Sequence, residues 1–118
     1  MNLNQVVLGY DALMSLMTQK EQIKIGLFFK LNKLKESLEK DYTDFQKKRM
    51  ELFDKYGEKD ADGNVAVLEE HKIKFITEIN DLLNTDIGNV IYKINTASIG
   101  EFDVDIKTAN GLLPFLEE

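Results

Sequence analysis

Apolar residues recur every three or four positions at the start of the chain, which predicts an amphipathic helix. Asn2 or Asn4 stands where such a helix needs an N-cap, and the pattern breaks at residues 18–20. One face of this helix is therefore expected to be buried, and its end to lead into a short connection. Its apolar positions are Leu3, Val6, Val7, Tyr10, Leu13, Leu16 and Met17.

A second and much longer helix is predicted from Gln22 to Tyr56, a stretch with no proline and with Gly26 as its one glycine. Its apolar stripe repeats at about 3.6 residues, so it fits a straight helix better than a coiled coil with a period of about 3.5. At about 1.5 Å per residue this helix would be roughly 50 Å long. The stripe consists of Leu27, Leu31, Leu34, Leu38, Tyr42, Phe45, Leu52 and Tyr56.

The amino-terminal half of the long helix is apolar around most of its circumference, whereas the half after Glu39 has a narrow apolar stripe. A helix that is apolar on several faces is usually buried from more than one side. We therefore expect the first helix, the carboxy-terminal strands or another subunit to cover this end. The residues concerned are Ile23, Ile25, Leu27, Phe28, Phe29 and Leu31.

Two ways of covering this end are compatible with the sequence. In the first, the identical apolar ends of two chains associate, which makes the protein a homo-oligomer, most simply a dimer. In the second, Tyr92, Phe115 and Leu116 fold back over the end within one chain. The candidate residues for an oligomer or partner interface are Ile25, Phe28, Phe29 and Tyr92.

A polar turn and a shorter helix are predicted after the long helix. Residues 56–64 indicate a helix stop and a tight reversal, with Gly57 in the left-handed C-cap position. Val65 to Leu68 is expected to be extended, and a helix from Glu69 to Leu83 should run antiparallel to the long one. Its expected inward positions are Ile73, Ile76, Ile79, Leu82 and Leu83, with Glu78 on the solvent side.

The hydrophobic period changes to two residues in the last third of the chain. This alternation predicts half-buried strands over Val90–Ile94 and Phe102–Ile106, joined by a loop. A short helix should begin near Thr108 or Ala109 and end near Pro114. The chain is therefore expected to end in a small mixed element rather than in another long helix.

Together these elements predict a mostly α (α+β) fold in one domain, residues 1–118. The expected architecture is a long central helix with antiparallel helices and a small carboxy-terminal two-stranded β element. The composition, 43% hydrophobic and 31% charged, is typical of a globular domain.

The net charge of −6 argues against broad binding to nucleic acid or to anionic lipid. No stretch approaches the roughly 20 apolar residues that cross a bilayer, and the amino terminus does not have the pattern of a signal peptide. The chain has no cysteine, which excludes disulfides, thiolate nucleophiles and zinc–thiolate sites. We therefore expect a cytoplasmic protein without membrane contact.

The segment Asp60-x-Asp62-x-Asn64 copies the first three ligand positions of a calcium loop. The match then fails, because Val65 stands where the loop needs glycine and His71 where it needs a bidentate glutamate. We interpret the segment as a solvated turn, and we expect no physiological calcium binding.

The other polar groups also have ordinary structural interpretations. Asp103 and Asp105 would share a strand face with Glu101 and could bind magnesium, yet any strand with one wet face shows this pattern. The basic run 47–49 could hold a phosphate group, but acidic neighbours offset its charge. His71 has no nucleophile or orienting residue at a suggestive spacing. No catalytic set can be assigned, so we expect neither enzyme activity nor a cofactor.

Four segments resemble a family of small bacteriophage and prophage proteins that is defined only as a domain of unknown function. They are residues 48–64, 78–83, 102–106 and 113–118, so the likeness extends over most of the chain. The resemblance implies a phage protein made in the host bacterial cytoplasm. It implies no activity and no functional residues.

Two functions are compatible with these observations. The first is a non-enzymatic binding protein that sequesters or inhibits a host defence protein or a small signalling molecule, because the chain is small, lacks a catalytic set and has an apolar helix end suited to docking. The alternative is a minor virion structural or assembly protein, for which a long helix is an equally suitable scaffold. The expected partners are a second copy of the chain, a host or phage protein, or a small ligand.

Overall fold

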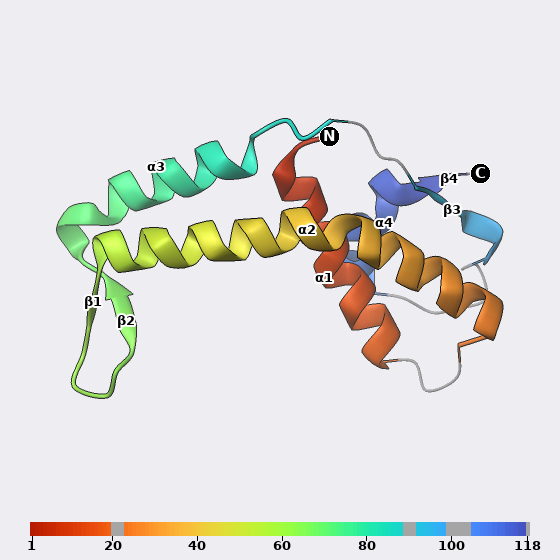
Figure 1. Ribbon diagram of the computed structural model, residues 1–118, viewed down its shortest axis with the longest axis horizontal. Helices are drawn as coiled ribbons and strands as arrows, with labels where there is room; N and C mark the ends of the chain where they lie inside the picture. The colour runs from red at the N-terminus through yellow and green to blue at the C-terminus, as the bar shows by residue number, and fades with distance from the viewer. Residues whose placement is uncertain (20–22, 89–91, 99–104, 118) are drawn as a thin grey trace.

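The computed structural model describes residues 1–19, 23–88, 92–98 and 105–117 (Figure 1). Its helices are α1 (Leu3–Gln19), α2 (Ile25–Tyr56), α3 (Lys72–Leu83) and α4 (Ile106–Leu112), with 3-10 turns η1 (Glu69–His71), η2 (Thr96–Ser98) and η3 (Leu113–Phe115). Its strands are β1 (Gly57–Lys59), β2 (Val65–Val67), β3 (Ile94–Asn95) and β4 (Leu116–Glu117). The fold is mostly α with a long central helix, as predicted. No helix in the described part of the chain is long and apolar enough to cross a membrane.

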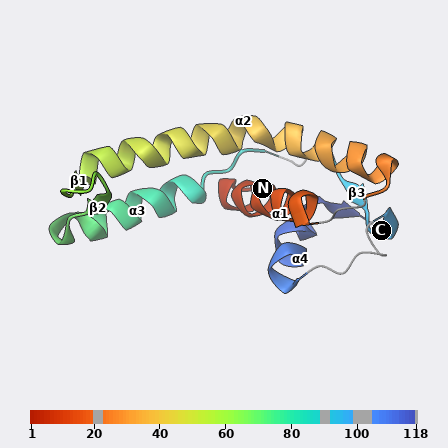
Figure 2. The ribbon, with the colours of Figure 1, turned by 90° about the horizontal axis from the view of Figure 1, so that it is seen from below.

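The helices lie in layers against α2. Figure 2 shows α3 and α1 along one side of α2, with α4 on the far side of α1. We call residues 1–19, 23–45, 92–98 and 105–117 the body, and residues 46–83 the arm. The last third of α2 belongs to the arm, where α3 runs back antiparallel beside it as predicted (Figure 1). The body has a third layer and the arm does not.

The body holds the hydrophobic core. The prediction of one unbroken helix is confirmed, and the stripe on its first half is buried against α1. α1 begins with the predicted cap: the backbone N–H of Gln5 donates to Asn2 Oδ1 at 3.0 Å, and the N–H of Asn2 donates to Gln5 Oε1 at 2.9 Å. The largest fully buried side chains are Phe115, Leu13, Leu31, Leu34, Ile94, Leu112 and Val6.

Phe115 fixes how closely α1 approaches the carboxy-terminal segment. Its ring lies over Gly9 of α1, where an added Cβ would stand 2.2 Å from Cε2 of the ring. On the neighbouring turn, a Cβ on Gly111 of α4 would stand 2.7 Å from the backbone oxygen of Leu8. Glycine at these two positions therefore lets α1 and α4 pack at backbone distance.

The prediction for the inward face of α3 is wrong in part. Ile73 and Ile76, expected inside, are 81% and 54% exposed, and Glu78, expected in solvent, is partly buried. The reason is Phe75, which the predicted stripe omitted: its ring contacts Phe53 of α2 with centroids 4.9 Å apart. Burying this large ring turns the helix, because Phe75, Ile79 and Leu82 form an alternative stripe at the same spacing.

The carboxy-terminal two-stranded element is present, but its strands differ from those predicted. Ile94 lies in β3, which pairs in parallel with β4, a strand that the pattern did not predict. Asp105 caps α4 and Ile106 is the first residue of that helix, so the helix begins earlier than expected. The other residues of the two predicted strands at 90–91 and 102–104 lie outside the described residues.

The turn after α2 contains a small sheet that the pattern did not predict. β1 and β2 pair antiparallel, with Gly57 opposite Val67 and Lys59 opposite Val65. Gly57 is extended, with φ −104° and ψ 167°, and is not the left-handed C-cap that we predicted. The left-handed backbone lies instead at Gly63, with φ 84°, inside the hairpin loop.

Candidate functional site

Three of the four predicted interface residues form an exposed apolar patch at the start of α2. Ile25 is 75% exposed, Phe28 42% and Phe29 63%. The two phenyl rings meet edge to face, with centroids 6.2 Å apart and planes at 70°. We call Ile25, Phe28 and Phe29 the tip patch. On the opposite side of the same turns, Leu27 and Leu31 are buried in the core.

The residues that we expected to fold back over this end do not cover the tip patch. Phe115 is fully buried against α1, and Leu116 pairs with β3. Tyr92 packs against the core, and Nζ of Lys33 lies 5.3 Å from the centroid of its ring. In the described ranges Tyr92 forms no aromatic pair with Phe28 or Phe29. The tip patch therefore stays largely exposed, while Phe115 and Leu116 are packed in the body.

The tip patch lies in the most basic stretch of an acidic chain. Residues 23–35 contain four of the 15 basic residues and none of the 21 acidic ones. The lysines alternate with the apolar residues, so positive charge borders the exposed rings. Residues 23–35 are therefore locally positive, whereas the chain as a whole has a net charge of −6. The electrostatic potential near the patch should differ in sign from that of the chain as a whole.

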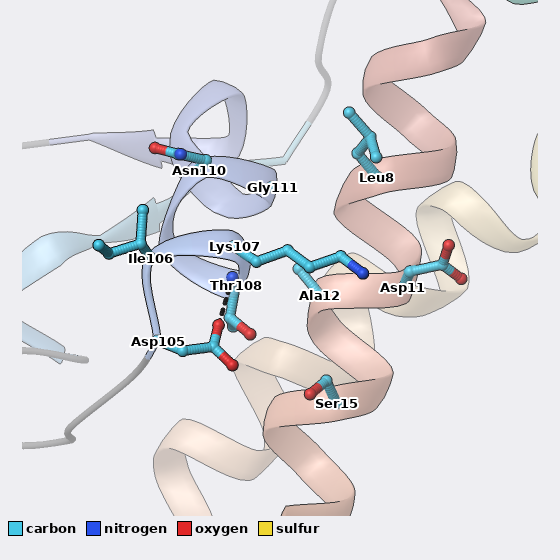
Figure 3. Close-up of a pocket in the computed structure, with 10 residues that line it drawn as sticks. All are labelled: Leu8, Asp11, Ala12, Ser15, Asp105, Ile106, Lys107, Thr108, Asn110 and Gly111. Atoms are coloured by element: carbon cyan, nitrogen blue, oxygen red, sulfur yellow. Dashed lines mark hydrogen bonds between the residues drawn. The ribbon is translucent and has the colours of Figure 1, made fainter.

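A groove between α1 and α4 is the second candidate site. Its volume is about 880 Å³, which is in the range of small-molecule pockets. Figure 3 shows Leu8 and Ala12 on its α1 wall, and the side chain of Lys107 extending across it toward α1. The lining residues are Leu8, Asp11, Ala12, Ser15, Asp105, Ile106, Lys107, Thr108, Asn110 and Gly111.

Both carboxylates of the groove already have protein partners. Oδ1 of Asp105 accepts the backbone N–H of Thr108 at 2.7 Å, and this bond lowers the pKa of the carboxyl group below its usual value. Oδ1 of Asp11 accepts the hydroxyl of Tyr42 at 3.0 Å. Burial, followed by this hydrogen bond, raises the pKa of the Tyr42 hydroxyl. The groove therefore contains polar groups that serve the fold, and they indicate no ligand class.

The segment that resembles a calcium loop forms the turn of the β1–β2 hairpin. Oδ1 of Asp60 accepts the backbone N–H groups of Asp62 and Asn64 at 2.9 and 3.0 Å. This carboxylate therefore holds the turn together. Among the described residues, no three His, Asp or Glu side chains are placed to hold a metal ion together.

The remaining predicted polar groups do not come together at one site. Asp105 lies at the start of α4 and not on a strand, while Glu101 and Asp103 lie outside the described residues. In the basic run, Arg49 stacks over Phe53 with 5.1 Å between the guanidinium carbon and the ring centroid. His71 lies at the far end of the arm, where its ring packs on Tyr56.

Sequence reasoning missed the groove and the bond between Asp11 and Tyr42. The bond joins residues 31 positions apart, which no local pattern indicates. One signal was present: glycine at positions 9 and 111 inside helical patterns suggests close backbone approach. Comparisons of the chain with family models, with curated proteins and with solved structures gave no match.

Proposed function

We propose that this protein is a non-enzymatic binding protein whose tip patch docks on an acidic, partly apolar surface of a host or phage protein. The observation that carries the proposal is the tip patch: three exposed apolar side chains in a stretch whose charged residues are all lysines. Aromatic side chains supply much of the energy at protein interfaces, and Phe29 is an exposed ring held on a rigid helix.

The lysines around the tip patch favour one kind of partner over another. Two copies joined at the tip would bring two lysine-rich stretches together, and like charges across an interface are unfavourable. An acidic partner gains from the same lysines, both in the encounter rate and in the register of docking. We therefore favour a different protein over a second copy at this surface, which revises the dimer interface expected from the sequence.

The resemblance to phage proteins supports a setting in an infected bacterium, where the partner would be a host defence protein. The alternative, a minor virion or assembly protein, uses the same surface against another phage protein. The identity of the partner decides between these two functions.

The test has two stages and uses the full-length chain. A photo-crosslinking phenylalanine analogue is placed at position 29 in cells of the host bacterium, during infection and without it, and the adducts are identified by mass spectrometry. Position 73 on α3 is the matched control, because Ile73 is also an exposed apolar residue. We expect an adduct with one other protein that forms from position 29 and not from position 73.

The purified partner then provides the quantitative test. Phe29→Asp should weaken the affinity at least about 30-fold, as loss of an aromatic hot spot does, and Ile73→Asp should change it less than about twofold. Binding should weaken as salt rises, because lysines face an acidic surface. An adduct that contains only two copies of this chain, or an affinity that Phe29→Asp leaves unchanged, contradicts the proposal.

A further inference from the structure

We propose that Tyr10 and Tyr42 form a modification site, at which a one-electron oxidant joins the two rings in a dityrosine cross-link between α1 and α2. The site lies in the body. Phe29 of the tip patch precedes Tyr42 by 13 residues, which is about 20 Å along the helix. The inference therefore does not depend on the tip patch or on its partner.

The two tyrosine rings are stacked in direct contact. Their centroids lie 4.0 Å apart and their planes are inclined by 19°. Aromatic pairs in proteins usually have centroid separations of about 4.5–7 Å, so this pair is unusually close. Coupling of two tyrosyl radicals joins the ring carbons next to their oxygens, which requires rings that touch. Both side chains are only partly buried, and this leaves the rings room to slide until two such carbons meet.

Tyr42 also has a base in place for its proton. Oδ1 of Asp11 accepts the Tyr42 hydroxyl at 3.0 Å. Burial, followed by this bond, raises the pKa of the hydroxyl, so the phenol keeps its proton at neutral pH. Loss of an electron makes a phenol strongly acidic, and a carboxylate already in hydrogen-bond contact can take the proton at that moment. Tyr42 should therefore be the first of the two rings to be oxidised.

The other two tyrosines are not arranged in this way. Tyr56 is buried, and its ring packs on His71. Tyr92 packs against the core, with Nζ of Lys33 over its ring. Neither has a second tyrosine ring against it in the described ranges. The chain has no tryptophan and no cysteine, so its tyrosines are the side chains that lose single electrons most easily.

The cross-link requires the removal of two electrons and two protons. One electron leaves the ring of Tyr42 as its proton passes to Asp11, and the second leaves the ring of Tyr10 as its proton passes to water. The two radicals form one carbon–carbon bond, and the hydrogen on each joined carbon moves through solvent to the neighbouring oxygen, which restores both phenols. The co-reactant is a peroxide that accepts both electrons: hydrogen peroxide becomes water, and persulfate becomes sulfate.

Photo-oxidation of the full-length chain with persulfate and a ruthenium bipyridyl sensitiser tests the inference, in solutions too dilute for chains to meet. Trypsin then separates the four tyrosines into different peptides, residues 1–20, 41–47, 56–59 and 75–93. We expect a product that joins residues 1–20 to residues 41–47 and that has the fluorescence of dityrosine. Its mass should be that of the two peptides less two hydrogen atoms.

Four variants assign this product to the proposed site. Tyr10→Phe and Tyr42→Phe should each abolish it. Tyr92→Phe is the matched control, since it removes a tyrosine outside the pair and should leave the yield unchanged. Asp11→Asn keeps the size of the side chain but removes the base, so the cross-link should form at least about tenfold more slowly. An unchanged rate in Asp11→Asn would contradict the role of Asp11.

The unmodified chain provides the decisive control for the fold. Unfolding it in urea before illumination should reduce the product to the level of the other tyrosine pairs. The inference is overturned if the folded chain gives no link between residues 1–20 and 41–47. It is also overturned if links to Tyr56 or Tyr92 form equally often, or if the unfolded chain forms the same link as readily. These outcomes need no substitution, so they hold even if a variant loses its helical circular dichroism.

Discussion

The body and the arm use the two ends of one helix in different ways. In the body, α2 is covered by α1, and α1 is covered in turn by α4, so Leu31 and Leu34 lose nearly all contact with solvent. In the arm, α2 is covered by α3 and, at its end, by the β1–β2 hairpin; Leu52 and Tyr56 of α2 are buried there, but no residue of α3 is fully buried. An apolar stripe therefore indicates which face of a helix is covered, while the number of layers decides how deeply it is buried.

The contacts that hold the arm are correspondingly weaker. The pair of Lys55 and Glu78 is solvent-exposed on the lysine side, and exposed ion pairs contribute about 0–1 kcal/mol. Oε2 of Glu78 is buried and has no hydrogen-bond partner, which offsets part of that contribution. The arm should therefore open before the body, in the way that regions with few buried contacts open locally.

The largest expected difference between the regions comes from two phenylalanines. Phe115→Ala should lower the free energy of unfolding by about 3–5 kcal/mol, because this ring is fully buried in the body. Phe75→Ala should cost about 1–2 kcal/mol, because its ring is only partly covered in the arm. Urea denaturation of both variants measures the two values. Equal losses would mean that the arm is as tightly packed as the body.

Two helical glycines give the next largest contrast. Gly9→Ala should destabilise the protein by about 1–3 kcal/mol, since its Cβ would overlap the ring of Phe115. Gly26→Ala at the tip meets nothing within 4 Å, so it should be neutral or stabilise by up to about 1 kcal/mol. Thermal melts of the pair separate steric overlap from helix propensity. Destabilisation by both substitutions would contradict this account of Gly9.

The sequence predicted the parts of the fold that follow from helical periodicity. The end of α2 at Tyr56, the extended segment at 65–67 and the cap at Asn2 are confirmed because each depends on neighbouring residues. The start of α2 is not, since the helix begins at Ile25, three residues after the predicted start. The pairing of β3 with β4 depends on residues 22 positions apart. It is parallel and needs α4 as the crossover between its strands, so alternation alone could not identify the partner strand.

The exposed apolar residues, too, could be predicted from the sequence only in part. The tip patch follows from an excess of apolar residues on one helix end, and the sequence identified Ile25, Phe28 and Phe29. The exposure of Ile73 and Ile76 was not predicted, because two stripes on α3 satisfy the same spacing, and only the contact of Phe75 with Phe53 selects one of them. Tertiary packing therefore decides which isoleucines are left outside.

The smallest expected effect is a pH dependence in the body. The carboxylate of Asp105 accepts the backbone N–H of Thr108, which lowers the pKa of Asp105 in the folded chain. Its ionised form thus stabilises the fold at pH values above its ordinary pKa, and this contribution is lost as the pH falls through the lowered value. Asp86, which accepts the N–H of Gly88 and lies near the amino terminus, acts in the same direction.

Asp105→Asn separates the charge of this cap from its hydrogen bond. Asparagine caps helices about as well as aspartate, so the variant should match the unmodified chain closely at acidic pH and fall slightly below it at neutral pH. Urea midpoints between about pH 7 and about pH 2.5 measure the difference, which isolates Asp105 because Asp86 is present in both chains. Asp105→Ala is the control, since it removes the cap at every pH. Parallel pH profiles for Asp105→Asn and the unmodified chain would show that the ionised cap contributes nothing to the stability of the body, and the hydrogen bond to Thr108 would then have to act without any help from charge.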